Sequence, residues 1–280
     1  MKTRTLPSGE KVAALGLGTW KMGERDQDRA QEIEAIRTAL DQGISLIDTA
    51  EMYADGGAER VLGQALAQQP GVRDQAFVVS KVYPHNASMA GVIAACERSL
   101  KRLQTDRIDL YLLHWRGQHS LEETVQGFEA LRRAGKIRYW GVSNFDTGDM
   151  RELWQVPGGS NAVVNQVLYN LSRRGIEWDL MPWHQNHQVL TMAYSPLEQS
   201  RLLSHRGLGQ LAATWGMTAS QVALSWLLNQ PDVIAIPKSS RLQRIHEFVR
   251  ASQRLLTEAE KLELDHLFTP PRSAKPLEML

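Results

Sequence analysis

The 280-residue chain has a single cysteine, no long hydrophobic run and almost no net charge, and each of these scarcities excludes a class of protein. One cysteine, Cys96, cannot form an internal disulfide, which excludes a disulfide-stapled fold. No run approaches the roughly 18 apolar residues that a membrane-spanning helix needs. The 32 Lys and Arg residues nearly balance the 31 Asp and Glu residues, giving a net charge of +1, and this balance argues against nucleic acid or an anionic membrane as a partner.

Targeting and metal-binding signals are also missing. The first nine residues, Met1–Gly9, hold no apolar core of a secretory signal, so we expect a cytoplasmic protein. His184 and His187 stand three residues apart on an expected helix, but no further ligands lie near them in the sequence, and no metal site is predicted. Cys96 falls on the apolar face of another expected helix and is interpreted as a packing residue. Trp178 and Trp183 are expected to pack or to cover a loop rather than to bind substrate.

Short apolar runs alternate with helical patterns eight times along the chain. A polar hairpin is expected in residues 1–12, with its turn at Pro7–Gly9. Buried strands are expected at 12–18, 44–48, 77–81, 108–114, 137–142, 162–166, 189–194 and 233–236. Helices are expected at 28–42, 57–69, 88–103, 120–135, 147–155, 176–186, 202–214, 218–229, 240–250 and 257–267.

Eight strand-then-helix units predict an α/β fold, a (β/α)8 barrel in which residues 1–280 form one domain, with an N-terminal hairpin and extra C-terminal helices. A doubly wound open sheet is the alternative architecture. The absence of a Gly-x-Gly-x-x-Gly pattern after the first strand weakens that alternative.

Three neighbouring strands of this barrel finish on polar side chains. Asp48, Lys81 and His114 close the second, third and fourth strands, and Tyr53 lies in the loop just beyond Asp48. Because barrel active sites lie at the carboxyl ends of the strands, we expect these four groups to converge. Each of Asp48, Lys81 and His114 alone could instead be a structural ion pair or a capped strand end, but the combination favours a site.

The four residues suit proton donation to a carbonyl group. A tyrosine hydroxyl has a pKa near 10, and an adjacent ammonium is expected to lower that pKa. Asp48 is expected to pair with Lys81 and keep it charged, and His114 to donate a hydrogen bond to the carbonyl oxygen. No strong nucleophile is evident, so the electron pair must come from a cofactor. Lys81 as a Schiff-base nucleophile of a barrel aldolase remains an alternative.

At this point the chain, from about Gly16 to Glu247, resembles the aldo/keto reductase family. The pattern Ile-Asp-Thr-Ala-x-x-Tyr holds Asp48 and Tyr53, Val-Ser-Lys-Val holds Lys81, and Leu-Leu-His-Trp holds His114. The resemblance implies that these four are the catalytic residues, with Tyr53 as the general acid and hydride transfer from NADPH. Its likeness is to methylglyoxal-reductase-like and 2,5-diketogluconate-reductase-like members.

The resemblance also implies a set of cofactor-binding residues. Gly18, Thr19 and Trp20 match the segment beneath the nicotinamide, where Asp48 also lies, and Ser143, Asn144 and Gln166 match the groups that bind its carboxamide. Tyr194 matches the aromatic residue that stacks on the nicotinamide ring, and Ser195, Pro196 and Leu197 match the segment that holds the pyrophosphate. The adenosine end is matched by Ile236, Pro237, Lys238, Ser239, Ser240, Arg244 and Glu247.

We expect NADPH rather than NADH as the cofactor, because Lys238, Ser239 and Arg244 would form a site for a 2′-phosphate dianion. A solvated basic start of a helix is the plainer interpretation of the same residues. The chain departs from the family pattern at Phe248, where Asn is common. An adenine hydrogen bond is then lost or replaced by an apolar contact.

Trp20, Tyr83, His114 and Trp115 are expected to line an apolar, aromatic substrate site. Small aldehydes, 2-oxoaldehydes such as methylglyoxal, and ketones fit such a site. The function predicted is NADPH-dependent carbonyl reduction with no nucleic-acid or membrane partner, and the family resemblance implies a monomer. The alternative is a nicotinamide-binding regulatory subunit that senses redox state with little turnover.

Overall fold

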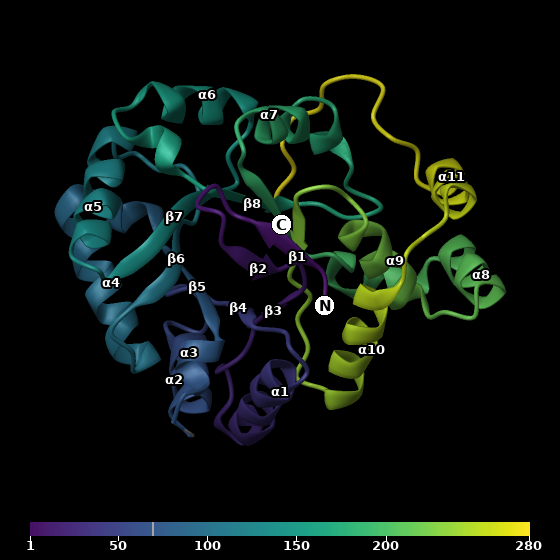
Figure 1. Ribbon diagram of the computed structural model, residues 1–280, viewed down its shortest axis with the longest axis horizontal. Helices are drawn as coiled ribbons and strands as arrows, with labels where there is room; N and C mark the ends of the chain where they lie inside the picture. Colours follow the sequence, from purple (N-terminus) through teal and green to yellow (C-terminus); the bar gives the residue numbers. More distant parts are fainter. Residues whose placement is uncertain (69) are drawn as a thin grey trace.

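A parallel sheet of eight strands forms the centre of the computed structural model, which describes residues 1–68 and 70–280 (Figure 1). Along the sheet the strands follow the chain in order from β3 to β10, so that each strand pairs with its neighbour in sequence. The strands are β3 (Gly16–Gly18), β4 (Leu46–Asp48), β5 (Phe77–Val82), β6 (Ile108–Leu113), β7 (Ile137–Ser143), β8 (Val164–Leu168), β9 (Leu190–Tyr194) and β10 (Val233–Ala235).

The two edges of this sheet meet and close it into a barrel. Parallel bridges join Leu15 to Ala235 and Gly18 to Lys238, and the Gly18 amide donates a hydrogen bond of 2.9 Å to the Pro237 carbonyl. The predicted (β/α)8 architecture is therefore confirmed, and the open-sheet alternative is wrong. Apolar side chains fill the barrel interior, so that any cavity must lie at its ends.

Helices surround the barrel, and most of them follow a strand and return the chain to the start of the next one (Figure 1). They are α1 (Arg29–Asp41), α2 (Gly57–Ala67), α3 (Val72–Gln75), α4 (Met89–Leu103), α5 (Leu121–Arg133), α6 (Thr147–Gln155), α7 (Leu180–Asn186), α8 (Arg206–Thr214), α9 (Ala219–Leu228), α10 (Leu242–Gln253) and α11 (Glu258–Leu267). Short 3-10 segments are η1 (Asp26–Asp28), η2 (Pro84–Asn86), η3 (Gly159–Asn161), η4 (Gly175–Glu177) and η5 (Glu198–Ser204). Among the helices described, none is both long and apolar enough to cross a membrane.

The predicted first barrel strand, 12–18, is wrong as one element. Residues Lys11–Ala13 form β2, which pairs with β1 (Thr3–Thr5) in an antiparallel hairpin, and the barrel strand begins only at Gly16. Because both segments are buried, the apolar run is continuous and its pattern does not show where one strand ends. The hairpin is also less polar than expected. Leu6 and Val12 are 2% and 4% exposed and pack against the interior side chains, so that the hairpin closes the amino-terminal end of the barrel.

Most helix ends lie where the sequence places them. Thr218 and Thr257 each form a complete capping box, and Gly43 and Gly135 adopt the positive φ that ends a helix, at 84° and 70°. Ser120 accepts the Glu123 amide, which forms half of the box predicted there.

Some predicted helix bounds are wrong. The helix predicted at 176–186 is divided into η4 and α7, α8 begins at Arg206 rather than at 202, and α3 was not predicted. The predicted end of α2 at residue 69 lies outside the described residues.

Candidate active site

The four predicted catalytic residues meet at the carboxyl end of the barrel. Asp48 ends β4, Lys81 lies in β5, His114 follows β6, and Tyr53 lies in the turn after β4. The Lys81 Nζ donates hydrogen bonds to Asp48 Oδ2 at 2.8 Å, to the Thr49 carbonyl at 2.9 Å and to the Tyr53 hydroxyl at 3.1 Å. All three ammonium protons are therefore used, and the predicted pairing of Asp48 with Lys81 is confirmed.

The second oxygen of Asp48 is fixed by a different strand. Gln166 in β8 donates from its Nε2 to Asp48 Oδ1 at 2.8 Å. Asp48 is 2% exposed and Lys81 is fully buried, so this ion pair is shielded from water and acts as one unit. Lys81 on β5 and Gln166 on β8, two strands that are not neighbours in the sheet, thus hold the Asp48 carboxylate in one orientation.

The electrostatics of the site keep both Lys81 and Tyr53 protonated. Burial lowers the pKa of Lys81, but Asp48 and then Tyr53 raise it by more, so the pKa ends above its ordinary value. Loss of hydration is the largest influence on the pKa of Tyr53 and raises it. Lys81 lowers that pKa, as expected, but does not offset burial and the charge of Asp48, so the pKa ends above its ordinary value. Tyr53 therefore enters a reaction with its proton in place.

His114 faces the same cluster as a neutral imidazole. Burial, followed by the charge of Lys81, lowers the pKa of His114 to about 2. Its ring contacts the Tyr53 ring edge-on at a centroid distance of 5.9 Å and the Trp115 ring at 4.9 Å. A neutral histidine at this position can donate one hydrogen bond without adding positive charge beside Lys81.

A cavity of about 620 Å³ opens above these four residues. Most of the residues predicted to bind the cofactor line it, namely Gly18, Trp20, Asp48, Ser143, Asn144, Gln166, Tyr194, Ser195, Pro196, Leu197, Ile236, Pro237 and Lys238. Thr19 does not line the cavity, because it is buried and its hydroxyl donates to the Asp48 carbonyl at 3.0 Å. The cavity therefore runs over the ends of β3, β4 and β6 to β10.

The polar residues on the β7 and β9 side of the cavity are bonded to one another. Tyr194 donates from its hydroxyl to Asn144 Oδ1 at 3.0 Å, and Asn144 Nδ2 donates to the His114 carbonyl at 3.1 Å. The Ser143 hydroxyl donates to the Gln166 carbonyl at 2.8 Å. Asn144 and Ser195 have φ values of 58° and 48°, an uncommon conformation for residues other than glycine, and such conformations cluster at functional sites.

The residues predicted for the adenosine end lie around the start of α10, and only the first three of them reach the cavity. Arg244 is half-exposed and its guanidinium pairs with Glu247 at 2.6 Å, while Glu247 also accepts from the Thr218 hydroxyl. Ser239 and Ser240 lie in the turn before the helix. Phe248 is 2% exposed and packs in the main core, so its ring offers little surface to an adenine.

Two of the aromatic residues predicted to bind the substrate, Trp20 and Trp115, line the cavity. Tyr83 is placed differently. Its ring packs edge-on against Trp115 at 5.8 Å, its amide donates to Glu51 at 2.8 Å, and it is not among the residues that line the cavity.

Sequence reasoning missed six residues that line the cavity, which are Lys21, Met52, Gln199, Ser200, Met279 and Leu280. Lys21, Met52 and the two residues of η5 lie one to three positions from predicted residues, so wider motif boundaries would have included them. Met279 and Leu280 belong to no motif and are remote from the others in sequence. Only the folded path of the chain brings them to the site.

The residues set aside in the sequence have structural contacts. His184 hydrogen-bonds Thr191 at 2.8 Å and Asn165 at 3.1 Å, and Trp183 stacks on His187 at 3.9 Å. Across the described residues, no group of three or more His, Cys, Asp or Glu side chains is placed to hold a metal ion. Cys96 is buried in the core, which confirms its assignment to packing.

Comparison with known proteins agrees with the site geometry. The methylglyoxal reductase YeaE of Escherichia coli is 47% identical over 274 residues, which cover 96% of this chain and 95% of that protein. The glyoxal reductase of Bacillus subtilis is 34% identical over 245 residues, covering 88% and 85% of the two chains.

Solved structures extend the likeness to the whole fold. An aldo/keto reductase of Klebsiella pneumoniae in complex with NADP and acetate has a TM-score of 0.96 and 47% identity, covering 100% of this chain and 99% of that one. A structure of an aldo-keto reductase of the same organism in complex with NADPH has a TM-score of 0.95. The model of the aldo/keto reductase family matches residues 14–268, and this chain belongs to that family.

Proposed function

We propose that this chain reduces small aldehydes, 2-oxoaldehydes such as methylglyoxal, and ketones to alcohols, with NADPH as the electron donor. The observation that carries the proposal is the contact of the buried Lys81 ammonium with both Asp48 and the Tyr53 hydroxyl, beside the neutral His114. The methylglyoxal and glyoxal reductases among its relatives support the substrate class.

The cavity suits a dinucleotide. Lys21 and Lys238 contribute cations to its lining, which the segment Ser195–Leu197 shares, so a pyrophosphate bound there would meet positive charge. The guanidinium of Arg244, half-exposed and paired with Glu247, and the hydroxyl of Ser239, which accepts from the Arg241 amide, would meet a 2′-phosphate at the start of α10. Asn144, Ser143 and Gln166 would hold the carboxamide, with Tyr194 against the ring. When bound, the reduced nicotinamide supplies a hydride.

The residues of the chain then manage the proton and the developing charge. Tyr53 donates its proton to the carbonyl oxygen, and the Lys81 ammonium at 3.1 Å stabilises the phenolate that remains. Asp48 holds Lys81 in place through the 2.8 Å ion pair. Neutral His114 donates a hydrogen bond to the carbonyl oxygen and so orients it. Trp20, Met52 and Trp115 exclude water around the reacting carbonyl.

The aldolase alternative conflicts with the geometry of Lys81. A Schiff-base lysine must lose a proton and attack a carbonyl, whereas the Lys81 pKa is raised and its three protons are engaged. Borohydride with methylglyoxal should therefore leave Lys81 unmodified, as read by mass spectrometry.

The test is NADPH oxidation with methylglyoxal and a panel of small aldehydes, comparing the wild type with Tyr53→Phe. Loss of a general acid is expected to lower kcat by about 10²- to 10⁴-fold. The Kd for NADPH, measured by fluorescence, should stay within about twofold because Tyr53 makes no charge contact that the cofactor needs. Running NADH beside NADPH tests the cofactor preference. Tight NADPH binding with negligible turnover on every carbonyl would instead support the redox-sensing subunit.

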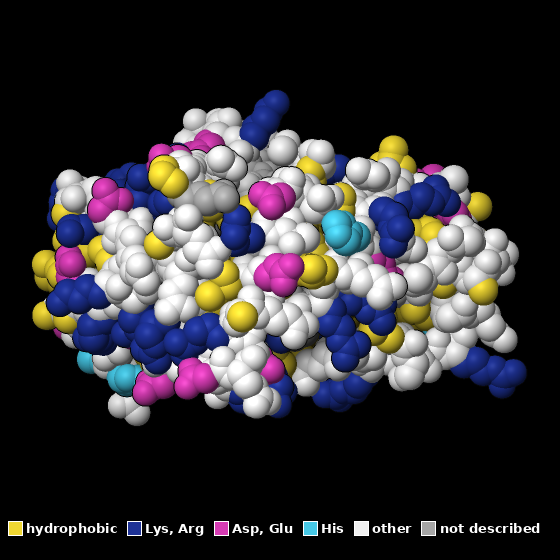
Figure 2. Space-filling model, turned by 90° about the horizontal axis from the view of Figure 1, so that it is seen from below, with side chains coloured by type: hydrophobic (Ala, Val, Ile, Leu, Met, Phe, Trp, Pro, Cys, Tyr) yellow, Lys and Arg dark blue, Asp and Glu magenta, His cyan; other side chains and the backbone are white. Residues whose placement is uncertain are grey.

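The proposal extends to a single-domain monomer in the cytoplasm that binds no nucleic acid. The near-zero net charge supports the absence of a nucleic-acid partner, and the face shown in Figure 2 carries both cationic and anionic side chains. The single cysteine, buried in the core, suits a reducing compartment. Light scattering coupled to size exclusion should give the mass of one chain at micromolar concentration, and the mass of two chains would contradict the monomer.

A further inference from the structure

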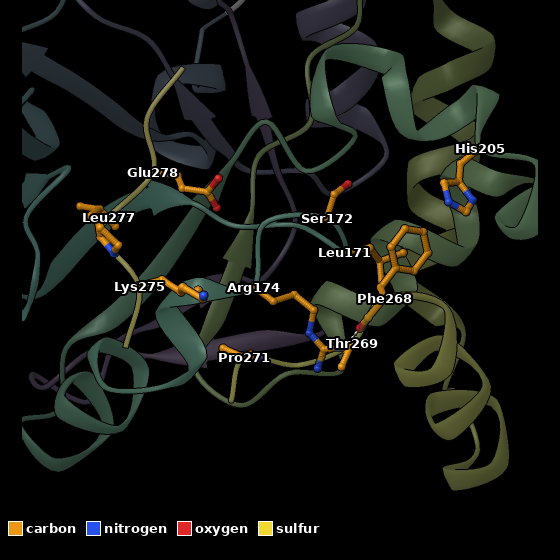
Figure 3. Close-up of a pocket in the computed structure, with 12 residues that line it drawn as sticks. Leu171, Ser172, Arg174, His205, Phe268, Thr269, Pro271, Lys275, Leu277 and Glu278 are labelled. Atoms are coloured by element: carbon orange, nitrogen blue, oxygen red, sulfur yellow. Dashed lines mark hydrogen bonds between the residues drawn. The ribbon is translucent and has the colours of Figure 1, made fainter. Parts of the chain in front are cut away.

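Residues 269–280 form a tail that contains no helix or strand and crosses from α11 to the barrel mouth (Figure 1). Most of its side chains are exposed. A cavity of about 730 Å³ lies between the tail and the loop 171–175, with Lys275, Leu277 and Glu278 on the tail side and Arg174 opposite (Figure 3). A smaller cavity of about 110 Å³ also borders Lys275–Leu277. The tail therefore touches the barrel at only a few points.

Those points lie at the end nearest the active site. Leu277 packs against the main core, the Glu278 carboxylate pairs with Arg173, and the Leu280 amide donates to the Tyr194 hydroxyl at 3.4 Å. Together they carry Met279 and Leu280 into the lining of the active-site cavity. The ion pair with Arg173 is the one charged contact of the tail in the part of the chain that the structure describes.

Arg173 has a second partner, Glu198, at the start of η5. Its guanidinium donates to Glu198 Oε1 at 2.9 Å, and Glu198 is 4% exposed. Asn170 holds the same segment by donating to Glu198 Oε2 at 2.8 Å and to the Ser195 carbonyl at 2.9 Å. Burial raises the pKa of Glu198, but Arg173 and Asn170 lower it by more, which keeps this carboxylate ionised for the contact.

We propose that Arg173 is a positioning residue that couples the NADPH side of the site to the carbonyl side, by tying the segment Ser195–Ser200 to the C-terminal tail through Glu198 and Glu278. This inference rests on the proposed function. NADPH fixes the segment, Arg173 transmits the constraint to the tail, and the tail then holds Met279 and Leu280 against the carbonyl substrate. Because coupling is reciprocal, whatever orders the tail also tightens NADPH binding.

A series of hydrogen bonds also connects the tail to both sides of the site. The tail contacts Tyr194, Tyr194 donates to Asn144, and Asn144 donates to the His114 carbonyl. The predicted nicotinamide contact and the carbonyl-orienting histidine are thus joined to the end of the tail. If the tail is released from Arg173, the contact between Leu280 and Tyr194, which begins this series of hydrogen bonds, is no longer held in place.

The test compares wild type, Glu278→Gln and Arg173→Met by hydrogen exchange of the backbone amides in residues 272–280, with and without NADPH. In the wild type NADPH should slow this exchange, and in both variants it should not. Since partly exposed ion pairs are weak, Glu278→Gln is expected to raise the KM for methylglyoxal and the Kd for NADPH only about threefold, with kcat within about twofold. Arg173→Met, which loses the contacts with both Glu198 and Glu278, should raise this KM and this Kd by more than threefold.

Lys275→Met is the matched control, since it removes a charge from the same tail at a residue with no ion pair among those described. It should leave exchange, KM and Kd at wild-type values. In an Arg173→Met background, Glu278→Gln should add nothing further. The proposal is overturned if NADPH does not slow hydrogen exchange of the tail amides in the wild type, or if it still slows that exchange in Arg173→Met. The exchange and Kd measurements need no turnover, so they stand apart from a failure of the proposed reductase activity.

Discussion

Lys81 carries a buried positive charge that pairs with Asp48 and donates a hydrogen bond to Tyr53. The ion pair of Lys81 with Asp48 is therefore the point of the site where a substitution should destabilise the protein most. Removing one member of a buried ion pair leaves the other charge uncompensated, at a typical cost of about 3–5 kcal/mol. We therefore expect Asp48→Asn and Lys81→Met each to lower the free energy of unfolding by about 3 kcal/mol, measured by urea denaturation.

The double variant Asp48→Asn with Lys81→Met should lose clearly less stability than the sum of the two single losses, because neither charge is then left alone. Its reductase activity should stay as low as that of the single variants. Strictly additive losses in stability would show that the two side chains do not act as a unit.

At this scale the sequence predicted the identities of the residues better than their energetics. Asp48, Lys81 and His114 were predictable because they end neighbouring strands of a regular fold. The direction of the Tyr53 pKa was not, because it depends on how completely the folded site excludes water, and no motif records that. The double contact of Arg173 was also invisible, since its two partners lie 25 and 105 residues away.

Among the elements, the N-terminal hairpin closes the barrel at the end opposite the active site. Leu6 is 2% exposed and packs against the interior side chains of the barrel. Leu6→Ala should lower the free energy of unfolding by about 2–3 kcal/mol through lost burial and a residual cavity. The value of kcat/KM should remain within about twofold, because Asp48, Lys81 and His114 lie at the carboxyl ends of the strands, at the other end of the barrel.

Lys11→Ala, an exposed substitution in the same hairpin, is the control and should change neither quantity. A fall in kcat/KM for Leu6→Ala in step with the loss of stability would mean that the hairpin shapes the active site as well.

The hairpin also shows where element prediction reaches its limit. Its turn at Pro7–Gly9 was predictable from residue types, but its second strand and β3 were merged because both are buried and carry no polar break. Helix ends with a complete capping box, such as those at Thr218 and Thr257, were placed correctly because the local side chains alone fix them.

For the whole molecule, the count of eight strand-then-helix units was enough to predict closure, since connections between neighbouring parallel strands leave few other arrangements. The position of the tail was not predictable. Residues 269–280 carry no periodic pattern, and their path depends on Leu277, Glu278 and Leu280 finding partners on distant elements.

The response of the molecule to acid depends on two histidines that are buried in the neutral state. Burial lowers the pKa of His114 to about 2 and that of His184 to about 3, while an unfolded chain binds a proton on each near pH 6.5. Because the unfolded state binds more protons between these values, stability must fall as the pH falls below 6.5. Between pH 7 and pH 5 each histidine should cost about 2 kcal/mol of the free energy of unfolding.

His184 offers the cleaner test, because its partners Thr191 and Asn165 lie away from the reacting groups. His184→Gln keeps a polar side chain there but cannot titrate, so its free energy of unfolding should fall about 2 kcal/mol less than that of the wild type between pH 7 and pH 5. Urea denaturation at the two pH values measures this difference. His266→Gln, at an exposed position on α11, should keep the wild-type dependence. An unchanged dependence in His184→Gln would mean that His184 is not held neutral, and that acid sensitivity arises from other groups.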